Sequence, residues 1–245
     1  MPVVPVVLRD AWTTVVPGPK DRHGPLPPLM LALTVVTGLV DAFSYLALGH
    51  VFVANMTGNV VFSGFALAGA PGFSLTASLA ALGAFAAGAL LGGRTAHRAQ
   101  AHRGRLLHRA LLLETVLVAA AYVTARTADP SHAAARFPLI ALLGLAMGVQ
   151  NAAARALAVP DLTTTVLTLT ITGIASDSRM AGGPGGRAGR RVVPAAAMFL
   201  GALVGALAVL HRHQSLPLLL AALLLAAVTA AAFTLTRSDR PWTRS

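Results

Sequence analysis

Three polar side chains share one face of an otherwise apolar segment near the start of the chain. Asp41 lies twelve residues into the apolar run 29–48, and Ser44 and Tyr45 follow it at i+3 and i+4. Residues at these spacings are neighbours on a helix surface. A carboxyl group, a hydroxyl and a phenol on one inward face suit a proton relay or a cation site. The alternative interpretation is a protonated aspartic acid that only joins helices by hydrogen bonding.

A second polar cluster opens the next apolar segment with the sequence Asn-Met-Thr-Gly-Asn. Asn55, Thr57 and Asn59 offer amides and a hydroxyl without net charge, and Gly58 allows a close backbone approach. Such groups can coordinate an ion or a polar solute. They can also satisfy the free N–H groups of a helix that begins inside the membrane, and the two roles are compatible.

A third polar group lies in the second half of the chain, where one apolar run ends and the next begins. It comprises Gln150, Asn151, Arg155, Asp161, Thr163, Thr164 and Thr165. An Arg–Asp pair beside a row of threonines suits anion binding or a gate. It equally suits an interfacial salt bridge, with the threonine hydroxyls bonded to their own helix.

The elements that must position these groups are long apolar runs. Hydrophobic residues make up 56% of the 245 residues and charged residues 11%, which is too little charge for a water-facing surface of this size. Eight apolar segments follow one another, at about 29–48, 52–70, 73–92, 109–125, 137–157, 162–176, 192–210 and 216–236. Six approach the roughly 20 residues that a spanning helix needs, whereas 52–70 and 162–176 begin with polar residues.

Charge placement tests whether those two segments span the membrane. If all eight segments cross and the N-terminus is inside, Lys and Arg number 12 inside and 7 outside. If 52–70 and 162–176 enter and return on the same side, the distribution becomes 16 inside and 3 outside. The positive-inside rule favours the second topology. We therefore predict an all-α polytopic bundle of six spanning helices plus two short re-entrant or broken helices.

The order of elements repeats along the chain. A shift of 106 residues places Asn55 on Asp161 and the segment 52–70 close to 162–176, although only six positions are identical across 38–69. Three spans per half is an odd number, so the halves 29–125 and 137–236 would have opposite orientations, as in many transporters. The alternative is chance similarity within an Ala- and Gly-rich membrane chain.

The ends of the chain differ in composition from the membrane domain 29–236. Residues 1–28 contain seven prolines, which predicts a disordered tail, and 237–245 is a short basic tail that we place in the cytoplasm. The chain has no cysteine, which excludes disulfides and thiol chemistry. Its net charge of +11 comes from arginines between apolar runs, so we expect topology signals and no nucleic-acid partner.

Catalysis receives no support from the pattern of residues. Glu114, the one glutamate, is expected one turn into its span with its carboxyl reaching the interface, and most histidines are expected in loops. No pairing of serine, histidine or carboxylates predicts an enzyme, a metal site or a cofactor. The expected partners are the lipid bilayer and a small polar solute, an ion or a proton, with the oligomeric state left open.

Two stretches resemble the YoaK family, a bacterial family of membrane proteins defined as a domain of unknown function. The first stretch runs from Gly38 through Asp41 to the Asn-Met-Thr-Gly-Asn element, and the second runs from Gly148 through Thr168. The resemblance covers about 29–236 and implies a multi-pass protein of the bacterial inner membrane with about six spans. It implies no substrate, and the Pro-rich N-terminal tail is a departure from it.

Two functional hypotheses follow from these residues. The first is a small transporter or channel, in which Asp41 is the titratable or ion-pairing group and the Asn and Thr side chains line a polar midplane site. The second is a membrane scaffold or complex subunit that transports nothing, because charged groups are scarce in the predicted core.

Overall fold

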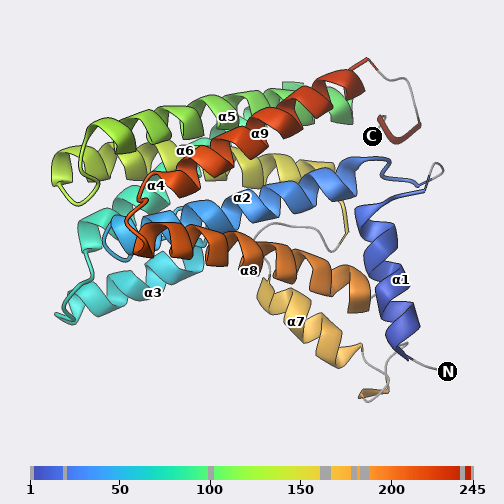
Figure 1. Ribbon diagram of the computed structural model, residues 1–245, viewed down its shortest axis with the longest axis horizontal. Coiled ribbons are helices and arrows are strands. Elements are labelled where there is room, and N and C mark those ends of the chain that lie inside the picture. The colour runs from blue at the N-terminus through green and yellow to red at the C-terminus, as the bar shows by residue number, and fades with distance from the viewer. Residues whose placement is uncertain are drawn as a thin grey trace.

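The structure is a computed structural model and describes residues 3–18, 21–98, 102–160, 167–177, 181–182, 188–237 and 241–243. Within these ranges the chain is helical (Figure 1). The α-helices are α1 (Val3–Val15), α2 (Leu26–Ala47), α3 (Met56–Leu67), α4 (Leu75–Arg98), α5 (Arg103–Thr127), α6 (Ala133–Leu157), α7 (Leu167–Ser176), α8 (Ala188–Leu210) and α9 (Leu216–Leu235), and a 3₁₀ turn covers Pro241–Thr243.

Six of these helices are long and apolar enough to cross a membrane. They are α2, α4, α5, α6, α8 and α9, with 20 to 25 residues each. At 1.5 Å per residue they are about 30–37 Å long, which matches the hydrocarbon core of a bilayer. Helix α3 has 12 residues and α7 has 10, so they extend only about 18 Å and 15 Å. The predicted division into six spans and two short helices is confirmed.

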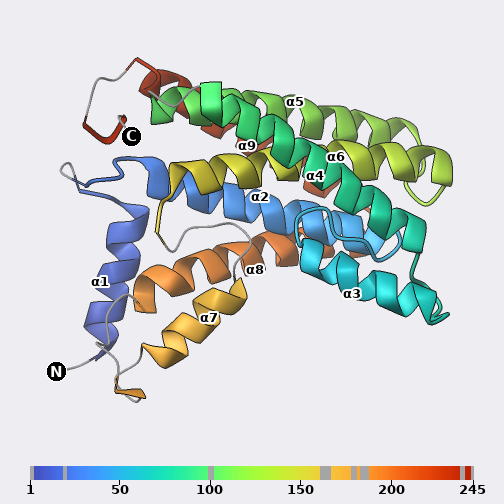
Figure 2. The same cartoon turned by 180° about the vertical axis from the view of Figure 1, so that it is seen from behind.

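The six long helices lie side by side and alternate in direction (Figures 1 and 2). Helices α2, α5 and α8 begin at one end of the bundle, where α4, α6 and α9 finish; we call this the arginine-rich end. Its described arginines are Arg9, Arg22, Arg94, Arg98, Arg103, Arg105, Arg109, Arg155, Arg190, Arg191 and Arg237. The other end, which we call the α3 end, has Arg126, Arg136 and Arg212.

Close helix contacts depend on glycine in both halves. A Cβ atom added to Gly201 of α8 would collide with the Val35 carbonyl of α2. One added to Gly148 of α6 would collide with the Phe85 carbonyl of α4 in the same way. Small residues allow such backbone approach, which is a principal source of attraction between helices in lipid.

The pattern of helix contacts repeats between the two halves. Helix α4 packs on α6 as α8 packs on α2, and α5 contacts α6 as α9 contacts α2. Helix α3 lies on α4 as α7 lies on α8, while α5 and α9 pack on each other. Because corresponding helices run in opposite directions, the halves form an inverted pair. The two short helices point their N-terminal ends towards the middle and their C-terminal ends towards opposite ends of the bundle (Figures 1 and 2).

The predicted disorder of residues 1–28 is wrong for much of that segment. Helix α1 forms over Val3–Val15, because Pro5 falls in its first turn, where the missing N–H has no intrahelical partner to lose. Pro27 and Pro28 likewise lie in the first turn of α2. The prolines of this segment therefore lie near the starts of two helices and in the connection between them.

Candidate functional site

The connection between α2 and α3 turns back into the bundle. Helix α2 ends at Ala47, and Gly49 and His50 adopt left-handed backbone angles with φ of +85° and +56°. The following Val51, Val53 and Ala54 are buried. Non-helical backbone inside a membrane must find hydrogen-bond partners within the protein. The backbone N–H and C=O groups around residues 48–55 therefore require acceptors and donors from other parts of the chain.

The Asp41 carboxylate supplies those acceptors. Its Oδ1 accepts hydrogen bonds from the backbone N–H of Val53 at 3.0 Å and of Ala54 at 2.9 Å, and its Oδ2 accepts a short one from the Asn55 side-chain amide. The side chain is 3% exposed. Three N–H donors on one carboxylate are the arrangement expected for its charged form.

Asn59 fixes the same connection from the α3 side. Its Oδ1 accepts a hydrogen bond from the Phe52 N–H at 2.9 Å, and its Nδ2 donates to the Phe52 carbonyl at 2.6 Å. The Asn59 side chain is fully buried. Asp41 and Asn59 together satisfy backbone groups of three successive residues and so position the start of α3.

The first turn of α3 is not capped by the predicted side chains. Asn55 occupies the N-cap position but makes no side-chain cap bond, because its amide donates to Asp41 instead. Thr57 is exposed on the helix surface rather than directed at Asp41. The structure therefore brings together Asp41, Asn55 and Asn59 and leaves Thr57 outside that cluster.

The predicted partners of Asp41 on its own helix point elsewhere. The Ser44 hydroxyl donates to the backbone carbonyl of Asp41 at 3.2 Å. The Tyr45 ring stacks on Phe52 with 5.0 Å between centroids and lies edge-on to His50 at 5.1 Å. This ring cluster continues through Phe62, Phe65 and Phe73. The arrangement supports a structural role for Ser44 and Tyr45 rather than a relay of protons to Asp41.

The third predicted polar group is described only in part. The Gln150 amide donates to the Thr37 hydroxyl of α2 at 2.8 Å, and its Oε1 is buried without a hydrogen-bond partner among the described residues. The Asn151 amide donates to the Met147 carbonyl of its own helix at 2.8 Å. Asp161, Thr163, Thr164 and Thr165 lie outside the described residues.

Glu114 is the buried acidic residue that the sequence pattern misplaced. The predicted span began at residue 109, whereas α5 begins at Arg103, so Glu114 lies about 16 Å along its helix. It is 1% exposed, and its Oε1 has no hydrogen-bond partner within the described chain. The expectation that its carboxyl reaches the interface is wrong, because six helical residues precede the apolar run. Residues 103–108, which precede the predicted span, are therefore helical as well.

Fold and site together define a polytopic α-helical membrane protein with two inverted halves, each of which contains one short helix in its described part. Residues 29–231 match the family described as "Protein of unknown function (DUF1275)". The match covers most of the chain, and the protein belongs to this family.

One curated relative is the UPF0700 transmembrane protein YoaK of Bacillus subtilis (strain 168). It is 34% identical over 152 residues, which cover 61% of this chain and 65% of the relative. The chain thus matches just under two thirds of the length of that relative. No solved structure matches this chain.

Proposed function

We propose that this protein carries a small polar solute or an ion across the bacterial cytoplasmic membrane between its two inverted halves. The observation that carries the proposal is the pair of short helices α3 and α7, which pack at matching places on α4 and α8. In membrane transporters, interrupted helices of two inverted repeats bring N-terminal helix ends and polar backbone to a site near the midplane.

The cluster around Asp41 supports this proposal as the frame of the site. Its hydrogen bonds keep the start of α3 at a fixed depth, with the uncapped first turn facing the middle of the bundle. The positive end of a helix dipole in that position favours an anionic or polar group. In this function Asp41 holds the frame in place and does not itself take up or release the transported species.

Glu114 is the better candidate for coupling to protons. Oε1 of the Glu114 carboxyl is buried without a hydrogen-bond partner among the described residues, and an ionised carboxylate at this depth costs several kcal/mol inside a membrane. In this proposal Glu114 therefore keeps its proton while the helices remain packed. Separation of α5 from its neighbours would hydrate the carboxyl group and let it release its proton. Protonation of Glu114 and opening of the bundle are therefore linked in this proposal.

The distribution of arginines supports an orientation with both termini in the cytoplasm. The start of α2 and the end of α9 share the arginine-rich end, and cytoplasmic ends of membrane proteins carry the excess of positive charge. We further propose that the protein has no catalytic activity and no nucleic-acid partner, and that its arginines serve orientation and lipid contact.

Purified protein in phosphatidylethanolamine–phosphatidylglycerol vesicles tests the function. Vesicles loaded with the pH dye pyranine and polarised with potassium and valinomycin report proton entry, and osmotic swelling in urea or glycerol reports neutral solutes. We expect a rate above that of protein-free vesicles. If proton entry carries the signal, Glu114→Gln should abolish it, and Asp129→Asn, a change at an exposed loop carboxylate, should not. Rates equal to those of protein-free vesicles in every assay would refute the transport proposal.

One observation favours the alternative of a scaffold or complex subunit. The Asp41 carboxylate is enclosed by its own connection and leaves little of its surface for a solute. A scaffold would give no flux in either assay and would yield one specific partner after crosslinking in cells. Flux by the purified protein alone would exclude this alternative as the sole function.

A further inference from the structure

Two buried side-chain oxygens have no hydrogen-bond partner, and they come from opposite halves of the protein. They are Oε1 of Glu114 on α5 and Oε1 of Gln150 on α6, and each residue is 1% exposed. In the described part of the chain, no other buried side-chain oxygen lacks a partner. A buried acceptor without a donor is costly, so two of them in one membrane domain require an explanation.

Four helices at the boundary between the halves surround these two residues. Helix α5 packs on both α6 and α9, while α2 packs on α9 and also contacts α6. These contacts close a ring in which α2 and α5 face each other across the interior. A polar side chain that points into this ring is shielded from lipid on every side and can act there without contact with the bilayer.

Neighbouring residues on α5 show that Glu114 is directed into the ring. Ala110, one turn earlier, belongs to one packed cluster with Val149 of α6. The hydroxyl of Thr115, the next residue, lies 2.9 Å from that of Thr229 on α9. Glu114 lies between the face of α5 that meets α6 and the face that meets α9. Since it is also buried, its carboxyl faces the interior of the ring.

Gln150 and Thr37 reach the same space from the other side. The Gln150 amide nitrogen donates to the Thr37 hydroxyl of α2 at 2.8 Å, and this hydroxyl donates to the Leu33 carbonyl at 3.0 Å. Thr37 and Glu114 each lie eleven residues after the first residue of their helices, which both begin at the arginine-rich end. Both are therefore about 16 Å from that end, near the middle of the bundle.

The surrounding helices bring no cationic side chain to this depth. Helix α9 has no titratable residue, and those of α4 and α6 lie towards the helix ends. On α2, Asp41 accepts three hydrogen bonds from its own connection to α3. On α5, His108 lies one turn or more towards the arginine-rich end, with its ring 3.3 Å from the Thr229 carbonyl. Within the described chain, the Glu114 carboxyl therefore depends on a proton or on a cationic ligand.

We propose that Glu114, Gln150 and Thr37 form a binding site for a small ammonium ion, such as ammonium itself or methylammonium. The inference rests on the proposed transport function and names the class of ion that is carried. The cation takes the place of the Glu114 proton, which leaves to water, so the buried site remains neutral.

The oxygens of the site match an ammonium group in number and charge. One carboxylate balances one positive charge, and the three N–H groups of methylammonium find acceptors in Glu114 Oε1, Gln150 Oε1 and the second lone pair of the Thr37 hydroxyl. Divalent metal ions require about six or more oxygen ligands. Among the described residues, no group of three or more His, Asp and Glu side chains could hold a metal ion.

Thermal unfolding of the purified protein in detergent tests the site. Ammonium and methylammonium chloride are compared at equal concentration with sodium chloride and with tetramethylammonium chloride, whose cation has the same charge but no N–H group. A ligand that binds only the folded protein raises its Tm. We expect the first two salts to raise the Tm by about 3–6 °C at about tenfold above their Kd. An equal Tm in all four salts would overturn the proposal.

Matched variants assign the effect to these residues. Glu114→Gln keeps the shape of the side chain and should abolish the ammonium effect, whereas Thr37→Val should raise the Kd about fivefold. Thr34→Val is the control, because the buried Thr34 hydroxyl donates to the Met30 carbonyl of its own helix at 2.9 Å. A cooperative transition in tetramethylammonium chloride shows that each variant is folded. An ammonium effect that persists in Glu114→Gln would overturn the proposal.

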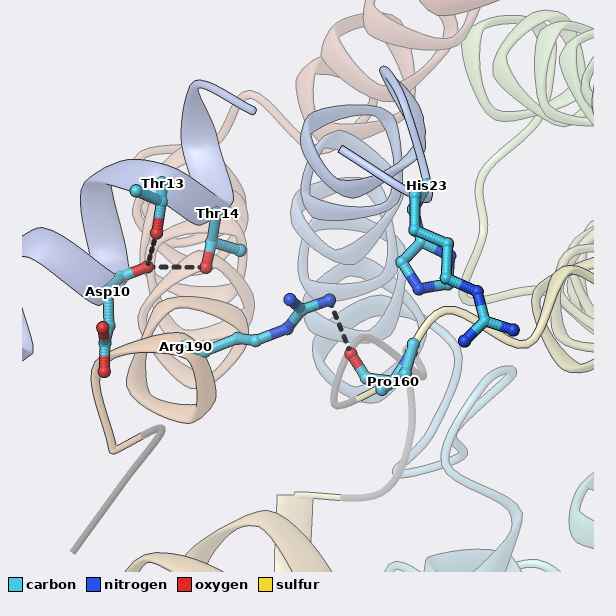
Figure 3. A pocket seen from close by; sticks show the side chains of 7 residues that line it. Asp10, Thr13, Thr14, His23, Pro160 and Arg190 are labelled. Carbon is cyan, nitrogen blue, oxygen red and sulfur yellow. Dashed lines mark hydrogen bonds between the residues drawn. The ribbon is translucent and has the colours of Figure 1, made fainter. Parts of the chain in front are cut away.

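A second carboxylate beside a cavity provides a further control. Asp10 of α1 lines a cavity of about 340 Å³ at the arginine-rich end, together with Arg22, His23 and Arg190 (Figure 3). The two arginines repel a cation, so Asp10→Asn should retain the full ammonium effect. Loss of the effect in Asp10→Asn would place the binding in this cavity and overturn the proposal.

Binding and transport give separable results, because the Tm is measured in detergent without any flux. Stabilisation specific to ammonium, with no flux in vesicles, would uphold the site and count against transport. Flux in vesicles without such stabilisation would overturn the site and leave the transport proposal standing.

Discussion

Removal of the Asp41 carboxylate should release the connection between α2 and α3. Asp41→Ala deletes the acceptor of three hydrogen bonds, two from the backbone N–H groups of Val53 and Ala54 and one from the Asn55 amide. A hydrogen bond to a charged group contributes about 1.5–3 kcal/mol. The free energy of opening this connection should therefore fall by about 4 kcal/mol or more, which is about a thousandfold in the open fraction.

Cysteine labelling measures that opening directly, because the chain has no cysteine of its own. Val53 is fully buried, so a Val53→Cys variant reacts with N-ethylmaleimide only when the connection opens. Labelling should become about a thousandfold faster when Asp41→Ala is added. A cysteine at the exposed Ser131, in the loop between α5 and α6, is the control and should react at one rate in both backgrounds.

Exchange of the two partners provides the decisive comparison. Asp41→Asn alone places two amide groups against each other and should speed labelling of Val53→Cys by about 10- to 100-fold. Adding Asn55→Asp restores an amide–carboxylate pair with reversed direction and should return the rate to within about tenfold of the parent. If Asp41→Ala leaves the labelling rate unchanged, or if the exchange restores nothing, the proposed role of the carboxylate is incorrect.

Three further results are expected. Gly88→Ala should lower the free energy of unfolding by about 1–3 kcal/mol, because the added Cβ meets the α6 backbone. Gly83→Ala on the same helix, where nothing lies within 4 Å, should raise the free energy of unfolding by up to about 1 kcal/mol. Thermal unfolding in detergent measures both variants, and equal effects would contradict the packing described. The pKa of His23 is held below its ordinary 6.5, so the unfolded chain takes up the proton more readily and stability should fall as the pH drops below 6.5. Unfolding scans from about pH 8 to about pH 5 should show a weaker dependence of stability on pH for His23→Asn. A cysteine at Ser131 should react with an impermeant maleimide in intact cells and one at Ala181 only after permeabilisation, and the reverse pattern would invert the proposed orientation.

The number and kind of membrane elements could be predicted from the sequence because two independent signals agree. The lengths of the apolar runs exclude many alternatives, and the arginines distinguish spanning segments from short ones. The residues at which the helices begin could be predicted less precisely. Arginine and histidine are compatible with a helix that projects beyond the hydrocarbon core, so the apolar run alone starts this span at residue 109 and places Glu114 too near the surface.

The partners of the polar residues could be predicted only in part. Asp41, Asn55 and Asn59 were identified by residue type and depth, but their hydrogen bonds go mainly to backbone groups of 52–54. A connection that turns back into the bundle leaves no periodic pattern in the sequence from which it could be predicted. The pairing of Ser44 and Tyr45 with Asp41 was inferred from helix spacing alone, and spacing does not determine side-chain direction.

The position in the second half that corresponds to Asp41 carries no carboxylate. The shift of 106 residues that relates the halves places Asp41 on Met147, which is fully buried and has no oxygen to accept N–H groups. The two halves therefore share their helix contacts but differ in the side chain at this position. Any movement of α3 away from α2 must break three hydrogen bonds to Asp41 at once, which makes this connection the stiff part of the first half.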